Sequence, residues 1–298
     1  MLGQRLIVGA LLIACLLGGV WADDAIDAVE APQAVAEILR AETWPPGLIV
    51  LPLVSLLAVL AARELSGLLR DKSIDASPIL TAGMALVGVL LTGIVPDRGT
   101  AFDGAATINT TTALVLVGSM IFYSLGKKTE GAVAAAGGAL LGFAYIGLLL
   151  GFLVAIRREH SAWTLLWVIG CAKSCDIGAY FVGKSFGKRK LILWLSPGKT
   201  WEGLAGGVAL AAIMGGLGGW ALEANGIEPF GPLVGAASGA ALGLVGQAGD
   251  LSASLLKRDA GAKDSGHSVP GFGGVIDVVD SLLLVGPVGF WLLRAITG

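Results

Sequence analysis

Apolar segments long enough to cross a bilayer recur along most of this 298-residue chain. A spanning helix needs about 20 mainly apolar residues. The candidate segments run approximately over 5–21, 46–62, 78–95, 106–125, 131–155, 161–182, 203–222, 232–250 and 275–296. Charged residues make up only 14% of the chain, against about 25% in a soluble domain. The expected fold class is therefore an all-α, polytopic membrane helical bundle of about nine transmembrane helices.

The first apolar segment has two interpretations. Arg5 precedes it, and Val20-Trp21-Ala22 followed by acidic residues comes after it. This pattern is typical of a membrane span but also of a cleaved signal peptide. In the second case eight spans remain.

The charges are sorted by loop, so the net charge of −2 describes neither end of the molecule. The loop at 22–45 is acidic, whereas most Lys and Arg residues fall in the loops near 63–77, 126–130, 183–202 and 251–274. The positive-inside rule predicts that the basic loops are cytoplasmic and the acidic loop is outside. Arg157 and Arg158 disagree with this topology, because they fall on the predicted outer side.

The 46 glycines predict helices that pack closely, since small residues let backbones approach one another in lipid. Three pairs have the spacing of such contacts: Gly138 and Gly142, Gly203 and Gly207, and Gly215 and Gly219. Each pair alone is a weak signal in a glycine-rich chain.

A strongly basic loop precedes the seventh span. The charged residues between Gly183 and Trp201 are all basic, namely Lys184, Lys188, Arg189, Lys190 and Lys199. It could anchor the chain to anionic headgroups, at about 1 kcal/mol per cation, or it could bind phosphate. The run Ser196 to Thr200 resembles the end of a P-loop, but Leu193 stands where the first glycine belongs, which excludes that fold. Pro197 and Gly198 predict a tight turn that presents Lys199.

Two ionisable residues lie inside the sixth span. Lys173 and Asp176 are three positions apart, so they share a helix face. A charge there costs about 2.5–3.5 kcal/mol on insertion scales. Either the two side chains neutralise each other, or they face a water-filled cavity in which Asp176 binds a metal or substrate.

A dense polar segment joins the last two spans. If the end of the eighth span is helical, Asp250, Ser254 and Lys257 share one face. Asp277 and Asp280 are three residues apart at the start of the ninth span. Two like charges there could be stabilised by a shared cation, and oxygen-only ligands favour Mg²⁺. Alternatively, the two acids could simply favour the helix dipole.

These blocks resemble the CDP-diacylglycerol synthases, also called phosphatidate cytidylyltransferases. That family's signature runs roughly Ser-x-x-Lys-Arg-x4-Lys-Asp-x-Gly-x2-Φ-Pro-x-His-Gly-Gly-x2-Asp-Arg-x-Asp, where Φ is apolar. The matching residues are Ser254, Lys257, Arg258, Lys263, Asp264, Gly266, Pro270, Gly273, Gly274, Asp277 and Asp280. The upstream blocks starting at Asp176, Phe186 and Ser196 also match, so the resemblance covers about 170–285.

Two residues depart from the signature. Phe272 stands where the family usually has His, and Val278 stands where it usually has Arg. Losing a cation beside the aspartate pair could weaken phosphate binding, and losing the imidazole removes a group able to transfer protons. Neither departure affects the carboxylates, so we expect a divergent member that retains activity.

The resemblance implies transfer of CMP from CTP to phosphatidate, giving CDP-diacylglycerol and pyrophosphate. It implies N-terminal transmembrane helices over 1–160 and a C-terminal transmembrane catalytic region with cytoplasmic loops over 161–298. The catalytic residues expected are Asp250, Lys257, Arg258, Lys263, Asp264, Asp277 and Asp280. The substrate-binding residues expected are Asp176, Lys188, Ser196, Lys199, Thr200, Glu202, Ser254, Gly273 and Gly274.

The expected metal is Mg²⁺ on Asp250, Asp277 and Asp280, with a second, monovalent cation left open. The expected partners are CTP, phosphatidate and membrane lipids, without nucleic acid, and a homodimer is left open. The expected location is the bacterial inner membrane, with the active site on the cytoplasmic side.

Two other functions use the same residues. A CTP-dependent lipid kinase, or a cytidylyltransferase for another lipid, needs the same polyphosphate site. A transporter would line an ion path with Lys173, Asp176, Asp277 and Asp280. Transport needs polar residues spread over several spans, whereas this chain collects them at one face.

Overall fold

The computed structural model of the protein describes residues 2–33, 36–37, 42–94, 101–125 and 129–298. Two cations of the expected basic loop at 126–130, Lys127 and Lys128, lie outside the described residues, as does Arg40 of the acidic loop.

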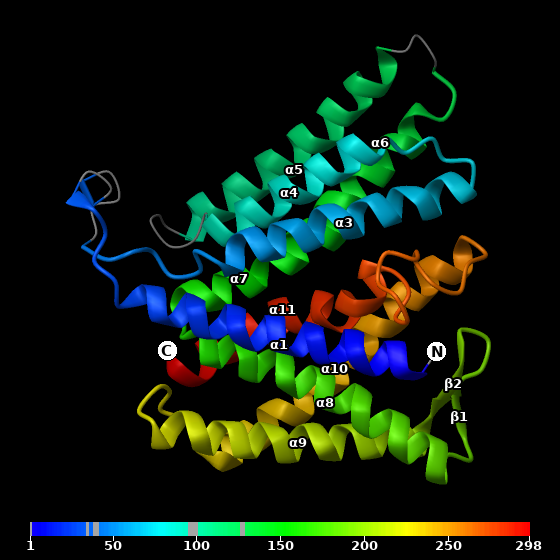
Figure 1. Ribbon diagram of the computed structural model, residues 1–298. Coiled ribbons are helices and arrows are strands. Elements are labelled where there is room, and N and C mark those ends of the chain that lie inside the picture. Colours follow the sequence, from blue (N-terminus) through cyan, green and yellow to red (C-terminus); the bar gives the residue numbers. More distant parts are fainter. Residues whose placement is uncertain (1, 34–35, 38–41, 95–100, 126–128) are drawn as a thin grey trace.

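Long helices run roughly side by side through the molecule (Figure 1). In chain order they are α1 (Leu2–Asp27), α3 (Val50–Asp71), α4 (Pro78–Ile94), α5 (Ala101–Ser124), α6 (Ala132–Leu141), η1 (Gly142–Leu148), α7 (Leu149–Glu159), α8 (Ala162–Phe186), α9 (Trp201–Ala224), α10 (Pro232–Asp259) and α11 (Val275–Thr297). The π-helical turn η1 joins α6 and α7 into one continuous rod.

Every expected apolar segment corresponds to one of these helices. Among the described residues, seven helices are long and apolar enough to cross a membrane. Helix α4 is apolar but shorter, and α10 carries more polar and small residues. Helix α10 also extends past the expected span as far as Asp259, which makes the polar end of that segment helical. The prediction of an all-α, polytopic membrane bundle is confirmed.

The predicted glycine contacts are also confirmed. A Cβ added at Gly203 would lie 2.9 Å from the carbonyl oxygen of Ala179 in α8, and one at Gly207 would lie 2.5 Å from that of Cys175. On the same helix, a Cβ at Gly219 would lie 3.0 Å from the Cα of Gly235 in α10. A larger residue would push α9 away from its neighbours. Glycine therefore lets α8, α9 and α10 pack backbone against backbone.

The basic loop between α8 and α9 folds into an antiparallel hairpin of β1 (Lys190–Ile192) and β2 (Ser196–Thr200). The turn lies over residues 193–195, so the prediction of a turn at Pro197 and Gly198 is wrong. Both residues lie inside β2. Proline is tolerated there because each strand of a two-stranded hairpin has a free edge, where its missing N–H costs no ladder bond.

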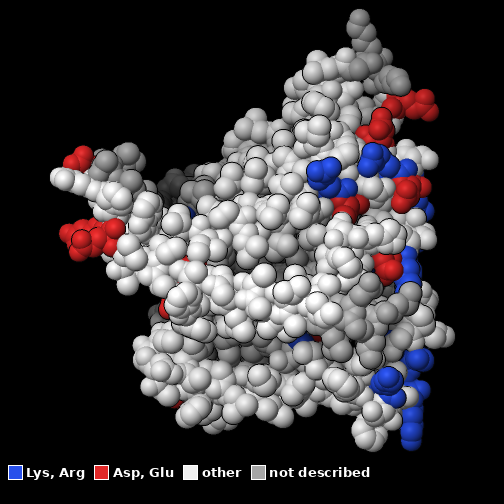
Figure 2. Space-filling model, in the orientation of Figure 1, with Lys and Arg blue, Asp and Glu red and all other residues white. Residues whose placement is uncertain are grey.

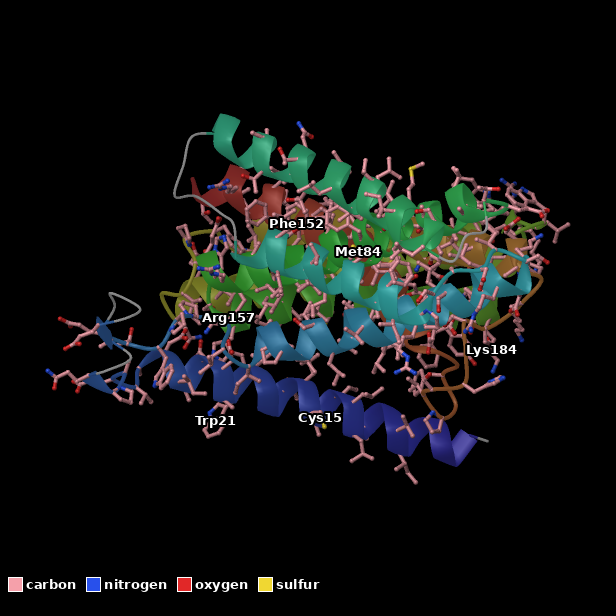
Figure 3. All side chains as sticks on the ribbon, turned by 90° about the horizontal axis from the view of Figure 1, so that it is seen from above. Cys15, Trp21, Met84, Phe152, Arg157 and Lys184 are labelled. Atoms are coloured by element: carbon pink, nitrogen blue, oxygen red, sulfur yellow. The ribbon has the colours of Figure 1, made fainter. Side chains whose placement is uncertain are left out.

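In Figure 2 most Lys and Arg side chains gather at one end of the bundle, together with several acidic side chains, whereas the charged side chains visible at the opposite end are mainly acidic. The hairpin and the loop between α10 and α11 lie at the basic end (Figure 1). Figure 3 shows Arg157 and Lys184 at opposite ends of the molecule. The loops that were expected to share a side of the membrane therefore do lie at one end of the fold.

Arg157 and Arg158 depart from this sorting, as the sequence indicated, and the contacts of Arg157 explain its position. Its side chain is buried at the acidic end and forms ion pairs with Asp23 and, at 2.5 Å, with Asp27 of α1. Asp23 also accepts the backbone N–H groups of Ile49 and Val50, at 2.7 and 3.2 Å, where α3 begins. Arg157 thus ties α7 to α1 and is not a free cation in a loop.

We predict that Arg157→Met destabilises the protein strongly, because the substitution leaves buried Asp23 without its counter-ion. Breaking a buried pair costs about 3–5 kcal/mol, so the thermal midpoint in detergent should fall markedly. The matched control is Lys72→Met, which removes the exposed ion pair between Lys72 and Asp259. Such pairs are worth about 0–1 kcal/mol. Equal, small shifts for the two variants would contradict the structural role of Arg157.

Candidate functional site

A cavity of about 430 Å³ opens at the basic end between α8, α9, α10 and the hairpin. The polar side chains that line it include Asp176, Lys184, Lys199, Gln247 and Asp250. The Nζ atom of Lys199 lies 2.7 Å from Oδ2 of Asp250, so β2 and α10 are joined by an ion pair. Gln247 donates to Oδ1 of Asp176 at 2.7 Å. The cavity therefore places a cation beside two carboxylates at the edge of the apolar bundle.

Lys173 and Asp176 form the ion pair that one interpretation predicts, whereas metal or substrate binding by Asp176 stays a prediction. Their charged atoms lie 3.6 Å apart, so they do form an ion pair. Asp176 also faces the cavity. Lys173 reaches α11 as well, donating to the carbonyl oxygen of Val278 at 2.9 Å and to Oγ of Ser281 at 2.7 Å.

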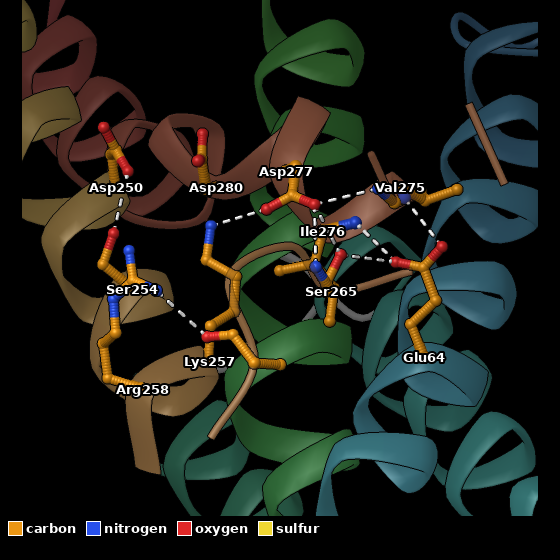
Figure 4. Close-up of polar contacts among 12 residues, drawn as sticks. Glu64, Asp250, Ser254, Lys257, Arg258, Ser265, Val275, Ile276, Asp277 and Asp280 are labelled. Carbon is orange, nitrogen blue, oxygen red and sulfur yellow. Dashed lines mark hydrogen bonds and ion pairs between the residues drawn. The ribbon is translucent and has the colours of Figure 1, made fainter. Parts of the chain in front are cut away.

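Asp280 projects from α11 toward this group and is 7% exposed. Its Oδ1 accepts the backbone N–H of Ser281 at 2.6 Å. The carboxyl groups of Asp280 and Asp250 face a common region (Figure 4), and Lys173 contacts Ser281, the residue that follows Asp280.

Asp277 has a different environment, shown in Figure 4. Its Oδ1 pairs with Nζ of Lys257 at 2.5 Å. Its Oδ2 accepts the backbone N–H groups of Ser265 and Gly274, at 2.8 and 2.9 Å, and the Ser265 hydroxyl at 3.0 Å. Gly274 is the N-cap residue of α11, so Asp277 both caps that helix and fastens the preceding loop to it.

Glu64 on α3 is a site residue that sequence reasoning missed. Oε1 accepts from the Ser268 hydroxyl and the Val275 N–H, at 2.7 and 2.8 Å. Oε2 accepts from the Ser265 hydroxyl and the Ile276 N–H, at 2.9 and 3.0 Å. A carboxylate from the N-terminal half therefore receives the free N–H groups at the start of α11. Glu64 and Val275 are 211 residues apart along the chain, and no local pattern connects them.

The other expected residues divide between the cavity and its surroundings. Arg258 donates to the carbonyl oxygens of Leu195 in the hairpin turn and Ala262, at 3.3 and 3.2 Å. Ser254 donates to Asp250 at 3.4 Å. Glu202 accepts the backbone N–H groups of Lys188 and Arg189, at 3.0 and 3.1 Å.

The side chain of Thr200 caps α9 by accepting the N–H of Gly203 at 3.1 Å. Ser196 begins β2, the strand that ends at Thr200. Gly273 has a φ of 103°, a left-handed conformation that favours glycine. Lys263 and Asp264 are exposed, and Asp264 lines a second cavity of about 540 Å³ together with Glu64.

The expected metal ligands are only partly brought together. In the described part of the chain, no group of three or more His, Cys, Asp or Glu side chains is arranged to hold a metal ion. Asp250 and Asp280 face a common region, whereas Asp277 is taken up by Lys257 and the loop (Figure 4). The metal set of Asp250, Asp277 and Asp280 stays a prediction.

These features define a polytopic helical membrane protein with a charged cavity at the basic end of its bundle. Residues 34–296 match the model of the cytidylyltransferase family. The chain belongs to this family, which confirms the resemblance noted in its C-terminal blocks.

Three curated relatives illustrate the match. The phosphatidate cytidylyltransferase of Synechocystis sp. is 30% identical over 269 residues, which cover 80% of this chain and 86% of the relative. The enzyme of the same name from Bacillus subtilis is 33% identical over 247 residues, covering 82% and 89%. That from Pseudomonas aeruginosa is 48% identical over 120 residues, covering 40% and 43%.

We predict that Glu64→Gln loosens the start of α11. The substitution replaces one carboxylate oxygen by an NH₂ group, which cannot accept hydrogen bonds from the backbone N–H groups there. Leaving such donors unsatisfied costs about 1–3 kcal/mol. Hydrogen exchange over residues 265–276 should accelerate in the purified protein. Asp71→Asn is the control, since Asp71 is an exposed carboxylate at the end of the same helix. Unchanged exchange in Glu64→Gln would show that Glu64 does not hold this loop.

Proposed function

We propose that this protein transfers CMP from CTP to phosphatidate, producing CDP-diacylglycerol and pyrophosphate. Membership of the cytidylyltransferase family and alignment with two phosphatidate cytidylyltransferases over 80% and 82% of the chain support this. The observation that carries the proposal is the charged cavity, where Lys199, Asp250 and Asp176 meet at the end of apolar helices. A lipid phosphate and a water-soluble nucleotide can both reach such a place.

The reaction needs little proton chemistry from the protein. An anionic phosphate oxygen of phosphatidate attacks the α-phosphorus of CTP, and a new P–O bond forms there. The bond from that phosphorus to the bridging oxygen of the β-phosphate breaks, and its electron pair leaves with pyrophosphate. Because both reactants are anions, the protein must mainly position them and neutralise their charge.

Several cations would neutralise the charge of the two reactants. Lys199 lines the cavity directly. Lys188 precedes the hairpin, Lys257 and Arg258 lie in the last turn of α10, and Lys263 lies in the loop that follows. Ser196, Thr200 and Glu202 stabilise the hairpin that carries Lys199. Of the expected site residues, Asp176, Lys199, Thr200 and Asp250 line the cavity, whereas Asp264 lines the second cavity. Ser254, Gly273 and Gly274 would contribute from α10 and from the loop before α11.

A magnesium ion would be held by Asp250 and Asp280 together with the phosphates of CTP. Mg²⁺ in phosphoryl-transfer sites is usually held by one or two carboxylates, waters and substrate phosphates. Asp176, which accepts a hydrogen bond from Gln247 at 2.7 Å, would assist from the same cavity. The bound ion would offset the charge of the departing pyrophosphate. Asp277 would contribute by keeping Lys257 and the start of α11 in place. The second, monovalent cation and the homodimer remain predictions.

The proposed orientation follows from charge. The basic end would face the cytoplasm, where CTP is found, in a bacterial inner membrane. The acyl chains of phosphatidate would remain in the bilayer, and its headgroup would reach the cavity between helices.

We predict that the two aspartates of α11 differ in their effect on stability. Asp280→Asn should lower kcat/KM for CTP by about 100-fold or more, in line with losing one preorganised charge contact. It should not lower the thermal midpoint, because it removes a buried charge that lies near the carboxylate of Asp250. Asp277→Asn should lower the midpoint as well as the activity, since breaking a buried pair with Lys257 costs about 3–5 kcal/mol.

Both quantities are measured on purified protein in detergent with CTP, Mg²⁺ and phosphatidate. Asp259→Asn is the control, because Asp259 is exposed at the end of α10. Full activity in Asp280→Asn would refute its role in the site. Full activity in Asp277→Asn would remove Asp277 from both the metal assignment and the supporting role.

We predict that Lys199→Met raises the KM for CTP more than it lowers kcat. The variant removes the cation that pairs with Asp250 and leaves Asp250 facing incoming phosphates, so nucleotide binding should weaken by about tenfold. Lys199→Arg should retain most of the affinity. A KM for CTP that is unchanged in Lys199→Met would exclude Lys199 from nucleotide binding.

A further inference from the structure

Lys173 is a cation inside a membrane-spanning helix, and its contacts extend beyond the neighbouring Asp176. A lysine that only neutralised Asp176 would need no other partner. Instead the ammonium group crosses to α11, where the Val278 carbonyl and the Ser281 hydroxyl accept its hydrogen bonds at 2.9 and 2.7 Å. Its distance to Asp176 is longer, 3.6 Å. The strongest contacts of Lys173 are therefore with α11 and not with its own helix.

The place where Lys173 meets α11 is informative. Val278 and Ser281 are three residues apart, so they are neighbours on the helix surface. Position 278 is also where the family signature has arginine and this chain has valine. The ammonium of Lys173 thus reaches the backbone of the residue at which the family signature has a cation and this chain has none.

The charged side chains around Lys173 indicate what its positive charge does in the site. Asp176 of α8 pairs with Lys173 at 3.6 Å, and Asp250 of α10 pairs with Lys199 of β2 at 2.7 Å. Asp280 of α11 precedes Ser281, which accepts from Lys173 at 2.7 Å. Removing Lys173 would make this site more negative by one charge. A more negative site would attract divalent cations more strongly and repel a triphosphate.

We propose that Lys173 is the charge-balancing and positioning residue of this site, and that it supplies from α8 the cation that the family signature supplies from position 278 of α11. It holds α8 to α11 beside Asp280 and keeps the carboxylate group from being too negative to accept CTP. This inference rests on the proposed function for its effect on CTP, but its effect on cation binding does not.

The test moves the charge from one helix to the other. The variants are Lys173→Met, Lys173→Arg, Val278→Arg and the double variant Lys173→Met with Val278→Arg. Lys72→Met is the control for loss of an exposed cation. Two quantities are measured on purified protein in detergent: the Kd for Mn²⁺, from the electron paramagnetic resonance signal of free Mn²⁺, and the KM for CTP in CMP transfer.

Lys173→Met should bind Mn²⁺ about threefold more tightly and raise the KM for CTP about tenfold, since one positive charge is lost from the group. Lys173→Arg and Lys72→Met should stay close to the wild type. The double variant should return both quantities toward the wild type, because the cation is restored on α11. If Lys173→Met does not remain monodisperse, the Mn²⁺ affinity of the double variant decides the question.

Unchanged Mn²⁺ affinity in Lys173→Met would overturn the proposal. So would equal damage in Lys173→Met and Lys173→Arg without recovery in the double variant, which would mean that Lys173 only packs between the helices. If the wild type shows no CMP transfer, the proposed function fails, while the Mn²⁺ series still tests the charge-balancing role of Lys173.

Discussion

Ion pairs between different elements determine the arrangement of the basic end of this protein. Lys199 joins β2 to α10 through Asp250, and Lys257 joins α10 to α11 through Asp277. A carboxylate placed at the edge of an apolar bundle is costly unless a cation or N–H donors accompany it. Helices α10 and α11 therefore depend on neighbouring elements for the charge that compensates Asp250 and Asp277, whereas α8 carries both Lys173 and Asp176. The ion pairs that hold the elements together at this end are consequently formed by residues of the site itself.

Glycine makes these pairs possible. Helix α9 lies so close to α8 and α10 that side chains at Gly207 or Gly219 would collide with backbone atoms. Close packing brings Asp176 on α8 and Asp250 on α10 to the same cavity, and it places the start of α9 directly after the hairpin strand that carries Lys199. At the other end, Arg157 fastens α7 to α1 through buried Asp23 and half-buried Asp27, which stabilises the bundle away from the site.

Much of the fold could be predicted from the sequence because the length and apolarity of each segment are local properties. The nine spans and the helical end of α10 follow from them. The cavity residues could be recognised because they occur in motifs with fixed spacing. Contacts between distant residues leave no such signal, so neither the clamp made by Glu64 nor the partners of Arg157 could be predicted. The hairpin turn was misplaced because Pro197 and Gly198 favour turns, yet a free strand edge also accepts them.

Asp277 illustrates a different difficulty. Its spacing from Asp280 predicts that both acids face one ion, but spacing on a helix cannot show which cation arrives from another element. Lys257, 20 residues earlier in the chain, occupies one of its oxygens, and the N–H groups that precede α11 occupy the other. The two aspartates therefore have separate tasks in the structure.

The central claim concerns which phosphorus of CTP is attacked. The direct measurement uses purified protein in phosphatidate-containing vesicles, with Mg²⁺ and CTP labelled at either the α- or the γ-phosphate. We expect the α-label to enter the lipid fraction, while the γ-label is released as pyrophosphate in equal amount. Transfer of the γ-label to lipid would identify a lipid kinase, and no transfer of either label would contradict the account.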